Sequence, residues 1–341
     1  MNPALSTALV ISAAWCLDMI FGDPERLPHP VRWMGTAIGW AEARFRRLSL
    51  DLRVSGAMMS GGLILLAWAA AAGAAAAAGW FSTAAGAAIE ALILFACIST
   101  RSLATEAEKM TRALQAGRIN TARALLGRIV GRDTDRLSRR QMARATVETV
   151  AENLVDGVVA PLFFAAVGGA PLAAAYRMIN TLDAMIGHRS PRYRQFGAFA
   201  ARVDDAANWI PARISVLLIA AAAQILCRRG RAAFSTAAAE GHRHTSPNAG
   251  FPEAAFAGAL EVSLGGPSRY GGVTVPKPWI GACFGPARTA DIRRARDLML
   301  LSSALCLVLM IAVAGVPAFF RQQAAGDALA GVVGKSGIRR R

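Results

Sequence analysis

Long apolar runs without charge alternate with charged segments along this chain. Two runs, 56–81 and 298–320, contain no charged side chain, and each is long enough to cross ~30 Å of hydrocarbon as a helix. The shorter runs 5–20 and 84–98 contain one acid each, and the second follows 56–81 so closely that we expect a helical hairpin. The pattern therefore predicts membrane spans at about 5–20, 56–81, 84–98 and 298–320.

Two further apolar segments are poor candidates for simple crossings. Residues 154–175 include Asp156, Pro161, Pro171 and two adjacent glycines, and residues 214–227 are short. Non-helical backbone at membrane depth is tolerated only against protein or a wet cavity. We therefore expect broken, re-entrant or protein-buried helices at both places, which leaves 99–297 largely on one side of the membrane.

A segment of different character lies at 101–146, where charges recur throughout. Apolar residues there, among them Leu103, Met110 and Leu114, follow helical spacing, so we expect a helical insert outside the hydrocarbon. The chain as a whole is predicted to be all-α, a polytopic helical membrane protein with one membrane domain over 1–320. Residues 321–341 are predicted to form a basic C-terminal tail.

Composition agrees with a membrane protein, and charge suggests its orientation. Of 341 residues, 54% are hydrophobic and 18% are charged, with a net charge of +16, a balance unusual for a soluble globular protein. The arginine-rich segments 22–55 and 99–146 flank the expected hairpin, so the positive-inside rule makes both cytoplasmic. We expect a multi-pass protein of the cell (inner) membrane with its active site facing the cytoplasm. No nucleic-acid partner is expected, because the basic residues are spread over every loop without interleaved aromatics.

Three acids spaced by four, Glu148, Glu152 and Asp156, would share one face of a helix. Three carboxylates on one face repel unless a positive group neutralises them. With Asn153 they form an oxygen-rich set that suits Mg²⁺. Arginines such as Arg132 would instead make a purely structural ion network.

Ionisable and amide side chains are also crowded in the segment that follows. Such groups are costly near hydrocarbon, so they are more often part of a site than incidental. They form two clusters, Asn180 with Asp183 and His188, and Arg202 with Asp204, Asp205, Asn208 and Arg213. The repeated pairing of acids with arginine and asparagine favours an anionic ligand, a metal or both.

Two loops present further polar groups. The proline-rich segment 21–35 is expected to be stiff and to hold Asp23, His29 and Arg32 at defined positions, unless it only terminates a helix. The Gly-Arg-Asp-Thr string contains Arg132 and Asp133, which are candidates for the site. The alternative is a structural role, in which Asp133 or the following threonine caps the next helix.

Small residues downstream are candidates for phosphate contacts. Ser246 and Asn248 lie in a polar loop, and Gly265 and Gly266 follow in a glycine-rich stretch. Backbone amides of such residues can wrap phosphate oxygens. We therefore expect both places to contact an anion.

Short strings spread in order over about residues 15–300 resemble the CobD/CbiB family. They are Gly22-Asp-Pro, Pro28-His-Pro-Val-Arg, Arg101-Ser-Leu, Val130-Gly-Arg-Asp-Thr, Val147-Glu-Thr-Val-Ala-Glu-Asn, Asp156-Gly, Ala160-Pro-Leu-Phe-Phe, Asn180-Thr-Leu-Asp, Asp204-Asp205, Pro211-Ala-Arg, Ser246-Pro-Asn, Ala257-Gly-Ala-Leu and Lys277-Pro-Trp-Ile-Gly. The resemblance implies an adenosylcobinamide-phosphate synthase, an integral membrane enzyme of cobalamin biosynthesis. Such an enzyme uses ATP to join adenosylcobyric acid to aminopropanol or aminopropanol phosphate through an amide bond.

That activity suggests roles for the polar clusters. The expected Mg²⁺ ligands are Glu148, Glu152, Asn153, Asp156, Asp204 and Asp205. Catalytic roles are expected for His188 or Asp183, which would take the amine proton, and for Arg132, Asp133 and Arg202. Contacts to substrate and phosphate are expected from Asp23, His29, Arg32, Arg101, Asn180, Asn208, Arg213, Ser246, Asn248, Gly265 and Gly266. The expected partners are a corrinoid, the amine, ATP and the lipid bilayer, and a homo-oligomer is compatible with the sequence.

A membrane permease or sensor for an anionic metabolite is the alternative. Buried acids, arginines and broken helices also mark transport sites. A transporter is expected to show an inverted repeat between its halves, and none is evident in the sequence. The polar motifs instead fall between helices near one face, where an enzyme meets soluble ATP, so the ligase is favoured.

Overall fold

A computed structural model of the chain describes residues 3–23, 30–188 and 190–336. Its helices in chain order are α1 (Pro3–Phe21), α2 (Pro30–Phe45), α3 (Leu52–Phe81), α4 (Thr83–Phe95), α5 (Thr100–Gln115), α6 (Ile119–Gly127), α7 (Arg139–Leu154), the π turn η1 (Val155–Val159), α8 (Ala160–Ile186), α9 (Ala198–Ala207), α10 (Trp209–Cys227), α11 (Gly230–Glu240), the 3₁₀ turn η2 (Gly241–Arg243), α12 (Gly250–Leu260) and α13 (Thr289–Ser336). The all-α prediction is confirmed.

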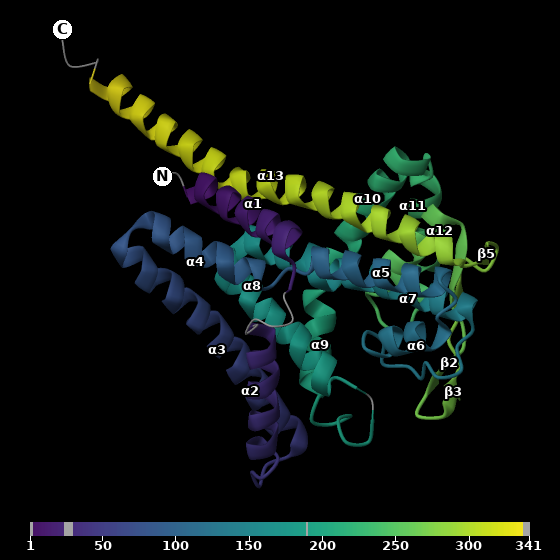
Figure 1. The fold of residues 1–341 in the computed structure, drawn as a ribbon. Coiled ribbons are helices and arrows are strands. Elements are labelled where there is room, and N and C mark those ends of the chain that lie inside the picture. Colours follow the sequence, from purple (N-terminus) through teal and green to yellow (C-terminus); the bar gives the residue numbers. More distant parts are fainter. Residues whose placement is uncertain (1–2, 24–29, 189, 337–341) are drawn as a thin grey trace.

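The long apolar helices make this a multi-pass membrane protein. Five helical stretches in the described ranges, Leu52–Phe81, Thr83–Gln115, Arg139–Ile186, Trp209–Cys227 and Thr289–Gly315, are long and apolar enough to cross a membrane. The predicted spans fall on α1, α3, α4 and α13, and α13 continues through the predicted tail as far as Ser336. The α3–α4 hairpin forms one end of the molecule (Figure 1), and at its tip Trp80 and Phe81 are each 90% exposed, as expected of side chains that face lipid.

The stretch around 154–175 is a broken helix, as predicted. The π turn η1 interrupts the α-helical register between α7 and α8, and Gly168 and Gly169 depart from helical geometry, Gly169 with φ +73. The π turn accommodates the start of α5, because the Ser99 amide donates to the Gly157 carbonyl at 2.9 Å. A Cβ on Gly157 would lie 2.3 Å from the Ser99 hydroxyl, so only glycine permits this approach.

Helices α7, α8 and α10 belong to the interior of the fold. In the apolar window of Arg139–Ile186, 56% of residues are buried, against 11% in α3. Leu154, Ile219 and Phe256 join α7, α10 and α12 in the main hydrophobic core. The burial of α7 and α8 agrees with the expected protein-buried helix at 154–175. The helices that contain both uncertain segments are nevertheless long and apolar enough to cross a membrane, and α10 leaves Leu217, Ile225 and Leu226 exposed.

Short strands near the C-terminal side of the chain were not predicted. β1 (Val262–Gly265) pairs with β4 (Trp279–Ile280) antiparallel and with β5 (Gly285–Pro286) in parallel, and β2 (Ser268–Tyr270) forms a hairpin with β3 (Val273–Val275). These strands lie at the opposite end of the molecule from the α3–α4 hairpin (Figure 1). They are too short and too rich in glycine to give a period-two signal in the sequence.

Candidate functional site

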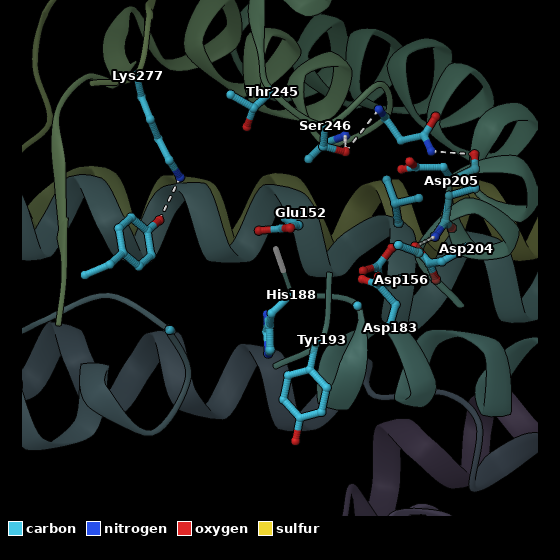
Figure 2. Close-up of a pocket in the computed structure, with 18 of the residues that line it drawn as sticks. Glu152, Asp156, Asp183, His188, Tyr193, Asp204, Asp205, Thr245, Ser246 and Lys277 are labelled. Carbon is cyan, nitrogen blue, oxygen red and sulfur yellow. Dashed lines mark hydrogen bonds between the residues drawn. The ribbon is translucent and has the colours of Figure 1, made fainter. Parts of the chain in front are cut away.

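The described structure contains a cavity of about 960 Å³ between α7, α8, α9 and the loop that precedes α12. Five carboxylates line it, Glu152, Asp156, Asp183, Asp204 and Asp205. Figure 2 shows Asp156, Asp183, Asp204 and Asp205 gathered on one side, Lys277 on the other, and Glu152 between them. The cavity therefore brings together acids from the three separate clusters of the sequence.

A chain of hydrogen bonds holds the acidic side in place. The Tyr176 hydroxyl donates to Asn208 Oδ1 at 2.9 Å, and the Asn208 amide donates to Asp204 Oδ2 at 3.0 Å. The Asn180 amide donates to Asp156 Oδ2 at 3.2 Å. Asn180 and Asn208 thus orient the acids, because each donates to a carboxylate that faces the cavity.

Asp204 is the most constrained of these acids. Its side chain is buried, and Oδ1 accepts no hydrogen bond within the described ranges. Burial, and to a lesser degree the nearby charge of Asp183, raises the pKa of Asp204 to about 7. A buried carboxylate with a vacant oxygen is costly on its own and is stabilised by a cation.

The loop that precedes α12 closes another wall of this cavity. The Asn248 amide donates to the Asp205 carbonyl at 2.7 Å, and Arg213 Nη1 donates to Asn248 Oδ1 at 2.8 Å. The Ser246 hydroxyl oxygen accepts the amides of Asn248 and of the next residue at 3.3 Å each. These predicted residues shape the wall, and Ser246 and Asn248 line the cavity directly.

Lys277 belongs to one of the strings that resemble the family, but no role was predicted for it. Its Nζ donates to the Tyr270 hydroxyl at 2.8 Å, and both side chains line the cavity. Besides that string, a further signal was the rarity of lysine, since the chain has three lysines among many arginines. The structure brings Lys277 opposite the acids although it lies about a hundred residues away from Asp183 in the chain.

A second cavity of about 210 Å³ adjoins the first, and Glu148 is part of its wall. Glu148 Oε2 accepts from Arg132 Nη2 at 2.6 Å, and Oε1 accepts from the Gly265 amide at 2.7 Å, with Arg144 Nε at 3.5 Å. Both oxygens are therefore occupied by protein donors. This is the structural ion network that was the alternative to Mg²⁺, and we exclude Glu148 from the metal set.

The predicted shared face of Glu148, Glu152 and Asp156 is divided between the two cavities. Glu148 lines only the smaller, Asp156 only the larger, and Glu152 lines both. Glu148 and Asp156 share a helix face but lie two turns apart, about 12 Å along the axis at 1.5 Å rise per residue, so each reaches a different cavity. Asn153 lines the smaller cavity, away from the cluster of aspartates.

Three loop predictions are corrected by hydrogen bonding. Asp133 accepts the amides of Gly271 and Gly272 at 3.0 and 2.8 Å, so it anchors the β2–β3 hairpin; it does not cap α7, which Ser138 caps with a capping box. The amides of Gly265 and Gly266 donate to Glu148 and to the Pro278 carbonyl, so neither is available to wrap a phosphate.

Other predicted residues lie apart from the large cavity. Asp23, Arg32 and Arg101 line a separate cavity of about 340 Å³ at the junction of α1, α2 and α5. Arg202 is exposed on α9 and is absent from the walls of both site cavities. His29 lies outside the described residues. The described residues of the N-terminal loop, Asp23 and Arg32, therefore line a different cavity from the acidic site.

Comparison with known proteins adds the family. A family model described as CobD/Cbib protein matches residues 11–299. The chain belongs to the CobD/Cbib family. It is 45% identical to the cobalamin biosynthesis protein CobD of Klebsiella pneumoniae subsp. pneumoniae, over 90% of this chain and 97% of that protein. It is 43% identical to the cobalamin biosynthesis protein CbiB of Salmonella typhimurium, with the same two coverages. No solved structure matches the chain at a significant level.

The CobD/Cbib assignment confirms the resemblance read from the sequence strings and supports a role in cobalamin biosynthesis. Whether the cavity fits Mg²⁺ is a separate question, which its residues address. Among the described residues, no three His, Cys, Asp or Glu side chains converge to hold a metal ion by themselves. Mg²⁺ is commonly held by one or two carboxylates, with water and substrate phosphates completing its shell. The acids of the CobD/Cbib cavity, with the vacant oxygen of Asp204, fit that mode.

Proposed function

We propose that this CobD/Cbib protein is an adenosylcobinamide-phosphate synthase. It would join adenosylcobyric acid to aminopropanol or aminopropanol phosphate in an ATP-dependent reaction. The observation that carries the proposal is the large cavity, which combines five carboxylates with one lysine on the opposite side. Its volume of about 960 Å³ is ample for a nucleotide together with the reacting arm of a larger substrate.

The reaction needs an activated acid, because a carboxylate is a poor acyl donor. In the first step the corrinoid carboxylate oxygen attacks the terminal phosphorus of ATP, and ADP leaves with the electrons of the broken P–O bond. In the second step the amine attacks the acyl carbon and phosphate leaves. Holding the reactants together in one cavity converts separate encounters into steps within a single complex.

We assign Mg²⁺ to the acids that face the large cavity. Asp156, Asp204 and Asp205, with Glu152, are the proposed ligands, used together with the phosphates of ATP. When bound, Mg²⁺ would neutralise charge that develops on the phosphoryl oxygens. Lys277 lies on the opposite side of the cavity, where its ammonium would contact phosphate oxygens from the other direction.

A base must accept a proton from the amine. Asp183 and His188 both line the large cavity, and we propose that one of them takes this proton. Arg132 contributes indirectly. Its ion pair orients Glu148 on α7, and the other Glu148 oxygen accepts the Gly265 amide at the end of β1.

Topology is part of the proposal. The basic segments 22–55 and 99–146 are proposed to be cytoplasmic, by the positive-inside rule. The acidic cavity would then open to soluble ATP at the cytoplasmic face of the cell membrane.

The test is reconstitution of the reaction with the full-length protein in detergent. Purified protein is incubated with adenosylcobyric acid, Mg-ATP and either amine, and the corrinoid mass is followed together with ATP consumption. Amide product with stoichiometric ADP supports the proposal. Asp204→Asn is expected to lose turnover on the order of 100-fold, whereas Asp297→Asn, an exposed acid outside both cavities, serves as the matched control. Corrinoid binding by folded protein without product would favour the permease or sensor.

A further inference from the structure

The smaller cavity of about 210 Å³ is a separate compartment that opens from the large one. Glu152, Tyr270 and Lys277 line both cavities and so form the boundary between them. The volume is below the roughly 300 to 1,000 Å³ of typical sites for drug-sized ligands and cofactors. It therefore suits a molecule of only a few non-hydrogen atoms.

An unpartnered acid faces this compartment. Glu253 on α12 is 4% exposed, and in the described parts of the chain its carboxylate accepts no hydrogen bond. His244 Nε2, at 3.9 Å, is the one basic atom within ion-pair distance there. Burial, followed by the charge of Lys277, lowers the pKa of His244, so the imidazole is a poor counterion. A buried acid without donors is costly, and a bound cation offsets that cost.

The walls of the smaller cavity contain both acidic and basic side chains. Glu253 and Glu152 supply acidic groups, while Lys277 and Arg132 supply positive charge. The Lys277 ammonium uses one donor on Tyr270 and keeps donors for a ligand. This combination matches a small molecule with an ammonium group at one end and a hydroxyl or phosphate at the other.

We propose that the smaller cavity is the binding site of the amine substrate, with Glu253 holding its ammonium group and Lys277 contacting its oxygen or phosphate end. The inference rests on the proposed ligase function and adds a place for the nucleophile. The amine enters the large cavity past Glu152 and meets the activated carboxyl there. Its nitrogen forms the C–N bond, and phosphate leaves with the electrons of the broken C–O bond. Of the two protons that the ammonium loses, one goes to the base at Asp183 or His188 and one to the departing phosphate.

The decisive experiment separates the amine from the other substrates. Steady-state KM values are measured for the amine, for Mg-ATP and for adenosylcobyric acid, in wild type and in Glu253→Gln. The variant is expected to raise the amine KM at least tenfold and to leave the other two KM values within about twofold. Glu261→Gln provides the matched control, since Glu261 follows the same helix, is half exposed, and lines neither cavity.

A second variant guards against misfolding of Glu253→Gln. Asn153 is half-buried and lines only the smaller cavity, so Asn153→Phe is expected to occlude it and to raise the amine KM as well. Thermal unfolding of each variant in detergent establishes that it is folded. An unchanged amine KM in folded variants, or a rise confined to the KM of Mg-ATP or the corrinoid, would overturn the amine site while leaving the ligase intact. Absence of any amide product from wild type would instead overturn the ligase itself.

Discussion

Replacing Glu148 with alanine separates an anchoring role from a metal-binding role. The Glu148 side chain is 4% exposed and its ion-pair partner Arg132 is 14% exposed, so solvent screens the pair little. Removing one member of such a buried pair leaves the other charge uncompensated, which costs about 3–5 kcal/mol. The Gly265 amide would also lose its acceptor, and because the three groups form one network this loss is counted within that range.

The assay is thermal unfolding of purified Glu148→Ala in detergent, with and without Mg²⁺. We expect the unfolding midpoint to fall by several degrees to the same extent in chelator and in Mg²⁺, because both Glu148 oxygens are bound by protein donors. Asp297→Ala is the control, since Asp297 is 50% exposed in its pair with Arg296 and such surface pairs contribute less than about 1 kcal/mol. A variant of unchanged stability that needs more Mg²⁺ for turnover would refute the anchoring role.

Three further predictions follow from single positions. Asp204→Asn is expected to abolish most Mg²⁺-dependent turnover while leaving the unfolding midpoint equal or higher, because it removes a buried acid; a lower midpoint with retained turnover would contradict this. Gly265→Ala should lower the free energy of unfolding by about 1–3 kcal/mol, since φ is +75 and a Cβ would lie 2.4 Å from the Pro278 carbonyl oxygen. Gly271→Ala is the control: φ is +54 but the space around a Cβ is open, so its cost in the same assay should be smaller. Burial raises the pKa of Glu253 well above its ordinary value, so the folded state binds this proton more tightly than the unfolded state and stability falls as pH rises from about 4.5 toward the raised pKa. Glu253→Gln should therefore raise the unfolding midpoint more at pH 8 than at pH 5, and an equal shift at both values would refute it.

Helical spacing placed three acids on one face of α7 and the turn that follows, but it did not indicate how the tertiary structure groups them. Glu148, Glu152 and Asp156 are equally spaced in sequence, yet Glu148 forms an ion pair with Arg132, and Asp156, two turns further along, lines another cavity. Arg144 lies four residues before Glu148, but the Gly265 amide, which occupies a Glu148 oxygen, lies more than a hundred residues away in the chain.

Properties that depend on a short stretch of chain could be read from the sequence alone. The length of an uncharged run decides whether a helix can cross a membrane, so the class, the main spans and the broken helix at 154–175 were predictable, and the ordered strings were sufficient to indicate the family. The partners of each polar group were not predictable, because they come from segments far apart in the chain. Packing of α7, α8 and α9 placed Asp156 and Asp204 in one cavity, the segment between β3 and β4 brought Lys277 into the same cavity, and Asp23 lies in a different one. Only the tertiary structure decides such contacts, since they depend on how helices pack and where their backbones break.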